Sequence, residues 1–168
     1  MLAKHSMKDS RLSRWGILIL VASIQAANYY FYDAISPLKR TLETEFGFTS
    51  SDFGLFVSFY SIPNTFLLMA VFGGIILDRL GIRRTGILFI GLMALGGFIT
   101  AYGASTFYTS GGPFYEVMGS FWKRYSPELK MMLLGRFFFG LGAETSIVVI
   151  SKIIVKWFIG KELAMALG

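Results

Sequence analysis

The sequence predicts an all-α membrane protein, and three observations lead to this fold class. Of its 168 residues, 54% are hydrophobic and only 15% are charged, whereas soluble domains average roughly 45–50% apolar and about 25% charged residues. The mean hydropathy is +0.60. Four long apolar stretches approach the ~20 residues that a helix needs to cross a bilayer, and none shows the polar–apolar alternation of a barrel strand.

These stretches predict four transmembrane helices and the first turns of a fifth. Helices are expected at 15–36, 53–77, 85–107 and 131–158, with the fifth beginning at 161–168. Pro37, Asp78 and Gly160 lie just beyond the first, second and fourth stretches, where each favours a helix end. Together, residues 15–168 are expected to form one partial transmembrane bundle.

The basic residues predict the orientation of this bundle. Ten Lys and Arg residues flank the side of the N-terminus, five flank the other side, and Arg136 lies within the fourth span. Because cytoplasmic loops are enriched in basic residues, residues 1–14 are expected to be a cytoplasmic basic tail. This asymmetry is enough to explain the formal charge of +6. The expected partner is therefore a lipid bilayer, and no nucleic-acid partner is expected. A cleaved signal peptide is disfavoured, because the first stretch is too long and lacks a small-residue cleavage site.

Polar side chains line one face of each of the first two helices. On the first helix these residues are Gln25, Asn28, Tyr29, Tyr32 and Ser36. On the second, Asn64 lies beside Pro63, whose missing N–H leaves a carbonyl that needs another partner. Such groups can also serve only to hold helices together, at about 0.6–2 kcal/mol each. Two polar faces together favour a polar cavity that includes Asn28, Tyr29 and Asn64.

Two ionisable side chains fall inside the fourth span. Glu144 lies near its middle, and Arg136 precedes Glu144 by eight residues, ~12 Å along a helix axis. A charge at the bilayer centre costs at least ~2.5–3.5 kcal/mol and usually serves function. The pair suits a small zwitterion bound between opposite charges; alternatively, each residue pairs with another helix and serves assembly only. Asp33, near the outer end of the first helix, is a third candidate, while Lys152 and Lys156 are expected to extend to the membrane surface.

Small residues and a loop complete the local predictions. Gly96, Thr100 and Gly103 on the third helix, and Gly135, Gly140 and Gly142 on the fourth, predict close helix packing. Residues 115–125 are expected to form an amphipathic interfacial helix.

The chain has no cysteine and one histidine, His5 in the tail. No enzymatic activity, metal site or cofactor is therefore expected.

The segment between the second and third helices carries a recognisable motif. From Gly74 to Arg84 it reads GIILDRLGIRR, which resembles the G-x-x-x-D-R-x-G-x-R-R signature of the major facilitator superfamily. Gly81 allows a tight turn, and Asp78 at a helix end can pair with a basic group across the bundle. The resemblance implies that the motif latches one state of an alternating-access cycle. Its residues here are Gly74, Asp78, Arg79, Gly81 and Arg84.

Further runs resemble the branch of that superfamily that contains the lysosomal dipeptide uniporter and its bacterial relatives. These runs are Asp33 and residues 60–64, 73–79, 135–144 and 157–163. The resemblance implies that Glu144 lies in the substrate cavity, where it suits a peptide ammonium group, and Tyr60 is expected to line the same cavity. The aromatic loop 107–130 lies outside the resemblance. The tail lacks an acidic dileucine sorting signal, which favours a bacterial inner membrane over a lysosome.

The resemblance implies that the chain is a fragment from the N-terminal six-helix half of a twelve-helix major facilitator fold. The expected function is secondary active or facilitative transport of a small solute by rocker-switch alternating access, with dipeptides or similar zwitterions as substrates. The expected partners are that solute, the bilayer and the remaining helices. A small four-helix membrane scaffold or assembly protein without transport activity is the alternative from another class.

Overall fold

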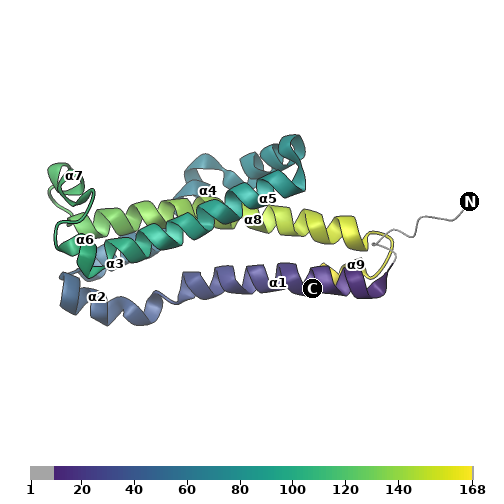
Figure 1. The fold of residues 1–168 in the computed structure, drawn as a ribbon, viewed down its shortest axis with the longest axis horizontal. Coiled ribbons are helices and arrows are strands. Elements are labelled where there is room, and N and C mark those ends of the chain that lie inside the picture. The colour runs from purple at the N-terminus through teal and green to yellow at the C-terminus, as the bar shows by residue number, and fades with distance from the viewer. Residues whose placement is uncertain (1–9, 168) are drawn as a thin grey trace, which may run out of the picture.

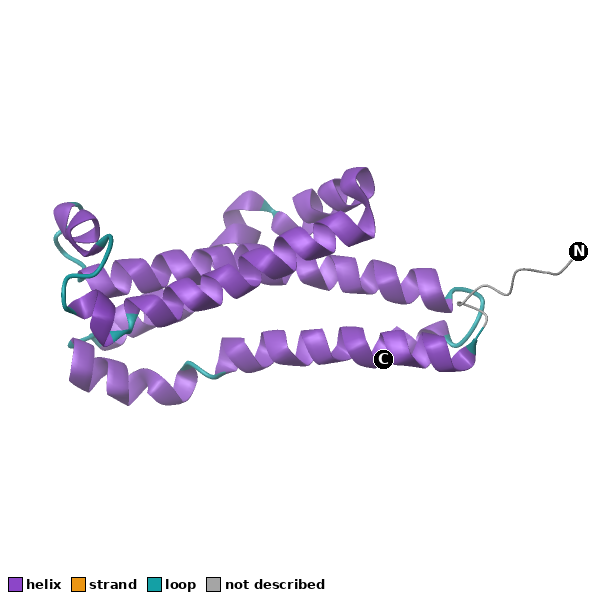
Figure 2. Ribbon diagram, viewed as in Figure 1, coloured by secondary structure: helices purple, strands orange, loops and turns teal. Residues whose placement is uncertain are grey.

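The computed structural model describes residues 10–167, and every regular element within them is helical (Figures 1 and 2). The elements are α1 (Arg11–Asp33), η2 (Ser36–Leu38), α2 (Lys39–Phe46), α3 (Ser50–Ser58), η3 (Phe59–Ser61), α4 (Ile62–Leu67), α5 (Met69–Gly103), α6 (Thr106–Thr109), α7 (Tyr115–Ser120), α8 (Pro127–Phe158) and α9 (Leu163–Leu167). The all-α prediction is confirmed for these residues. Most of the expected tail 1–14 lies outside them.

Two of the described helices, α5 and α8, are long and apolar enough to cross a membrane. The expected number of four spans stays a prediction, but α5 is not a single rod. Its backbone leaves helical geometry at Gly81, with φ 80° and ψ 165°, a conformation that glycine adopts without steric strain. Before the break, Gly73 lies against Thr145 and Asp78 pairs with Lys152, so the contacts advance along α5 and α8 in the same direction. After the break, contacts further along α5 are made with earlier residues of α8. The chain therefore reverses direction at Gly81, between the expected second and third helices.

The expected helix 53–77 is interrupted twice. Residues 59–61 form the tighter helix η3, and Leu68 has the left-handed φ of 47° and ψ of 46°. Pro63 cannot donate a backbone hydrogen bond, and Asn64 competes with the helix for one. The Asn64 Oδ1 accepts from the Ala70 N–H at 3.3 Å, across the break. The amide predicted to face a cavity thus stabilises a discontinuity in the helix.

Other helix ends differ by a few residues from their predicted positions, for reasons of capping. The helix α8 begins at Pro127 rather than 131, because the Ser126 side chain accepts from the Leu129 N–H at 3.2 Å. The helix α5 ends at Gly103 rather than 107, because the Ser105 side chain caps α6. Gly160, with φ 74°, separates α8 from α9.

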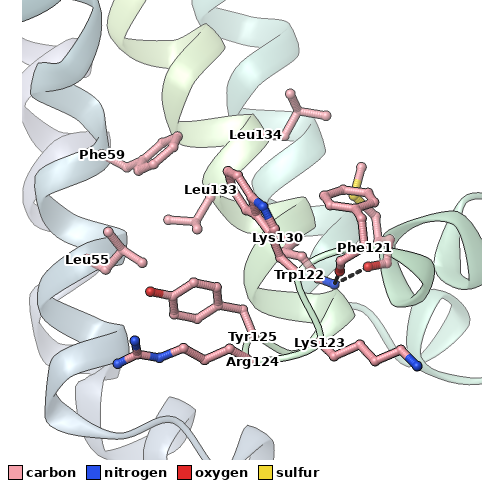
Figure 3. Close-up of a pocket in the computed structure, with 11 residues that line it drawn as sticks. Leu55, Phe59, Phe121, Trp122, Lys123, Arg124, Tyr125, Lys130, Leu133 and Leu134 are labelled. Carbon is pink, nitrogen blue, oxygen red and sulfur yellow. Dashed lines mark hydrogen bonds between the residues drawn. The ribbon is translucent and has the colours of Figure 1, made fainter.

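The predicted interfacial helix 115–125 is shorter than expected. Only Tyr115–Ser120 is helical, because Phe121 is extended and the following residue has a left-handed φ. Lys130 of α8 is 6% exposed and donates to the carbonyls of Met118 and, at 2.7 Å, Phe121 (Figure 3). This buried ammonium holds the end of α7 against α8. A cavity of about 620 Å³ lies beside it, and none of the predicted site residues lines that cavity.

The helices α5 and α8 pack closely along much of their length (Figure 1). A Cβ added at Gly96 would overlap the backbone of Phe139, and one added at Gly135 would overlap the Thr100 side chain. A Cβ added at Gly142 would overlap the backbone of Phe89. The predicted small-residue packing is therefore confirmed by contacts that only glycine permits.

The helix α1 lies antiparallel to α8 and contacts it near both ends. At one end, the Arg14 Nη2 donates to the Glu162 Oε2 at 3.2 Å, and the ring of Trp15 packs edge-on against Phe158 at 6.3 Å between centroids. The hydrogen bond from Arg14 lowers the pKa of Glu162. At the other end, α1 supplies Tyr32 to the site described next.

Candidate functional site

Arg136 occupies an aromatic cage inside the bundle. Its side chain belongs to α8 and is 2% exposed. The guanidinium carbon lies 5.3 Å from the ring centroid of Tyr32, 5.5 Å from Phe56, 5.6 Å from Tyr60 and 5.7 Å from Phe139. The rings come from α1, α3, η3 and α8. Because a cation is attracted to ring faces within about 6 Å, the cage stabilises the guanidinium without using its hydrogen-bond donors.

Two nitrogens of this guanidinium, Nε and Nη2, have no hydrogen-bond partner among residues 10–167. Their hydrogens point along one edge of the planar group, the edge that receives a carboxylate through two parallel bonds. Buried polar groups are paired in the large majority of cases, so this unpaired edge indicates a place for an acceptor. A cavity of about 260 Å³ adjoins Arg136, and its lining consists mainly of apolar side chains from residues 31–42, from Phe56 of α3, and from α5 and α8.

Tyr60 connects Arg136 to the acidic member of the predicted pair. Its ring faces Arg136, and its hydroxyl lies within electrostatic reach of Glu144. Glu144 is half-buried on α8. The structure therefore brings together three of the predicted residues, namely Arg136, Tyr60 and Glu144, whereas Tyr29 is exposed. Opposite charges bridged by a phenol suit recognition of a polar solute.

The remaining predicted cavity residues have other surroundings. Asn28 is 2% exposed and its Oδ1 is unpaired within the described chain, so it remains a candidate polar group inside the bundle. Asp33 is exposed at the end of α1, and Asn64 bridges the break before α5.

Sequence reasoning missed the aromatic cage, although part of its signal is local. Phe56 and Tyr60 are four residues apart and Arg136 and Phe139 are three apart, spacings that place side chains on one helical face. Nothing in the sequence brings Tyr32 into contact with them. The cage requires three segments to meet.

The motif residues lie around the reversal at Gly81. Asp78 forms an ion pair with Lys152 of α8, and both side chains are partly exposed. Lys152, which is predicted to extend to the membrane surface, has Asp78 as a partner 74 residues away in sequence. Arg79 and Arg84 are exposed. Outside its own helical turn, no atom of the described residues lies within 4 Å of the position that a Cβ would take at Gly74.

The arrangement contains a guanidinium, a phenol and a carboxylate, which recognise a ligand through charge and hydrogen bonds. Within residues 10–167 there is no group of three or more His, Asp or Glu side chains placed to hold a metal ion.

Comparison with known proteins gives a consistent family. Residues 19–168 match the Major Facilitator Superfamily. The lysosomal dipeptide transporter MFSD1 of Homo sapiens is 30% identical over 161 residues, which cover 95% of this chain and 30% of the relative. The same transporter of Bos taurus is 29% identical, covering 90% of this chain and 28% of the relative. The same transporter of Danio rerio is 29% identical, covering 94% of this chain and 30% of the relative.

No solved structure gives a significant match to the chain. The chain spans about 30% of the length of the curated relatives it matches. The family match nevertheless covers most of the chain, and it includes the Gly81 motif, α8 and the caged arginine. The chain belongs to the major facilitator superfamily.

Proposed function

We propose that this chain forms part of a transporter that moves a small solute across a membrane, and that the solute is a dipeptide or a similar zwitterion. The observation that carries the proposal is the unpaired edge of Arg136, held inside the bundle by four rings. The names of the relatives, lysosomal dipeptide transporters, support the same substrate class. Family membership does not favour a scaffold or an enzyme.

In this proposal the solute carboxylate binds the Nε and Nη2 edge of Arg136, and the solute ammonium group binds Glu144 beside the Tyr60 hydroxyl. Eight residues separate the two charged residues by ~12 Å along the axis of α8. Two extended residues span at most ~7 Å. The two side chains would have to span the remaining distance, and this distance is shorter for a dipeptide than for a single amino acid.

The transport cycle is proposed to be rocker-switch alternating access, with the Asp78–Lys152 pair stabilising one state. The distribution of basic residues supports a cytoplasmic N-terminus. The relatives are named as lysosomal and give no support to the expectation of a bacterial inner membrane. We therefore propose no specific membrane for this multi-pass protein, which would work together with the remaining helices of the full transporter.

The test measures dipeptide uptake by the full transporter in liposomes, with Glu144→Gln and Arg136→Gln. Loss of one charge-assisted contact costs ~1.5–3 kcal/mol, so uptake efficiency at low substrate should fall about tenfold to 100-fold. The exposed residues Glu116 and Arg124 supply the matched controls Glu116→Gln and Arg124→Gln, which should leave uptake unchanged.

Modified substrates identify which end of the solute each residue binds. An N-acetylated dipeptide should be transported poorly by the unmodified transporter, and Glu144→Gln should cause little further loss, because the contact is already gone. A C-terminally amidated dipeptide should show the same relation with Arg136→Gln. If blocking either end reduces uptake equally in the parent and in the matching variant, the assignment of these residues to the solute is wrong.

A further inference from the structure

A cavity of about 580 Å³ lies at the end of the bundle where the chain reverses at Gly81. We call it the Gly81 cavity. Its walls are residues 80–84 of the reversal and Ile153, Lys156 and Trp157 of α8. It shares no residue with the site around Arg136. The proposed solute path therefore does not explain it.

The walls of the Gly81 cavity combine positive charge with apolar surface. Arg83, Arg84 and Lys156 supply three cations, and none of the described residues that line it is acidic. The nearest acid in sequence, Asp78, is already paired with Lys152. Leucine and isoleucine side chains and the indole of Trp157 form the rest of the wall. Charge complementarity therefore calls for an anion that also carries apolar groups.

The position of the cavity fits a membrane surface. It lies between the reversal in α5 and the last turns of α8, and these two helices are the described ones that are long and apolar enough to cross a bilayer. Tryptophan is enriched at the level of lipid headgroups, and basic pockets between transmembrane helices bind anionic lipid headgroups. A small free anion would use the cations but would leave the apolar walls unexplained.

We propose that the Gly81 cavity binds the headgroup of an anionic phospholipid. The phosphate lies among Arg83, Arg84 and Lys156, and the start of the acyl chains lies against the aliphatic walls beside Trp157. This differs from the general attraction of basic loops to a membrane, because the three cations line one cavity with room for one headgroup.

Trp157 provides a direct readout, because it lines the cavity. The full transporter keeps Trp157, and every other tryptophan, including Trp15 and Trp122, is replaced by phenylalanine. It is placed in neutral-lipid nanodiscs with increasing phosphatidylglycerol that carries brominated acyl chains, which quench nearby tryptophan. Quenching should saturate at a low fraction of this lipid. Brominated phosphatidylcholine should quench weakly and without saturation.

The charge dependence is tested with the triple variant Arg83→Gln/Arg84→Gln/Lys156→Gln. One basic residue near an anionic surface contributes about fivefold in affinity, so this variant should weaken the saturable quenching at least tenfold. The matched control Arg40→Gln/Arg124→Gln/Lys123→Gln removes two arginines and one lysine elsewhere, and it should leave the quenching unchanged. If the triple variant does not fold, Lys156→Gln alone should still weaken the quenching about fivefold.

Three results would overturn the proposal. Equal quenching by brominated phosphatidylcholine would show that the headgroup charge is not recognised. Equal weakening by the control variant would show a diffuse effect of net charge. Reversal of the quenching by millimolar inorganic phosphate at constant ionic strength would show a free-anion site rather than a lipid site.

Discussion

Replacing Arg136 by methionine should stabilise the protein while abolishing solute binding. A charge within a bilayer costs up to ~2.5–3.5 kcal/mol, the value reached at its centre, and here two guanidinium nitrogens have no partner within the described residues. The four rings offset this by about 2 kcal/mol in all, since cation–π contacts around one cation are not additive. Methionine keeps the volume and gains ~0.3–1.5 kcal/mol from sulfur–aromatic contacts. The expected net change is a gain of about 1–3 kcal/mol.

Lys130→Met is the matched comparison, because Lys130 is also a buried cation of α8, six residues away. Its ammonium donates to two backbone carbonyls. Hydrogen bonds to a charged group contribute ~1.5–3 kcal/mol each, and water recovers part of this near the end of the helix. Lys130→Met should therefore lower stability by about 2 kcal/mol or more. The two substitutions are chemically alike and are expected to have opposite signs.

The assay is thermal unfolding of the purified transporter in detergent, followed by dipeptide binding on the same samples. Arg136→Met should raise the midpoint and bind no detectable dipeptide, whereas Lys130→Met should lower the midpoint and keep its affinity. Arg136→Lys should remain folded and bind weakly, because an ammonium cannot form the two parallel bonds of the guanidinium edge. A lower midpoint for Arg136→Met, equivalent to a loss of about 1 kcal/mol or more in the free energy of unfolding, would refute the reasoning and make Arg136 a structural residue.

Two further predictions concern packing and the motif. Gly135→Ala should destabilise the protein by ~1–3 kcal/mol in the same thermal assay, because a Cβ there overlaps α5; Gly97→Ala, where nothing lies within 4 Å, should be neutral or slightly stabilising. Lys152→Asp should slow uptake with little change in thermal midpoint, since exposed ion pairs contribute only ~0–1 kcal/mol. The charge-swapped double variant with Asp78→Lys should restore uptake, and failure to restore it would contradict a role for the pair in the transport cycle.

The parts of the fold that the sequence predicted depend on local chemistry. Apolar length predicts helices, and a glycine beyond a charged helix end predicts the reversal at Gly81, whose φ is 80°. The packing of α5 on α8 follows from glycines at helical spacing. The features that escaped prediction depend on contacts between distant segments. The break at Leu68 is closed by the side chain of Asn64, and α7 ends early because Lys130 reaches it from α8.

The same distinction applies to the candidate site. Arg136 and Glu144 could be identified because an ionisable residue in an apolar run is conspicuous. Tyr60 and Phe56 can be recognised as parts of the site only in the folded chain, where η3 and α3 pack against α8. Asp33 is a predicted candidate because it is a charge near a helix end, and it is exposed in the structure.

Burial of a charge is therefore a coarse criterion for function, and the charges of α8 show why. Lys130 is nearly as buried as Arg136, yet its hydrogen bonds to backbone carbonyls explain it fully as a structural residue. Lys152 has Asp78. Arg136 differs from both because its surroundings stabilise the charge through rings and leave one edge of donors unpaired. Within residues 10–167 no acceptor serves that edge, and in the proposed function the carboxylate of the solute supplies it.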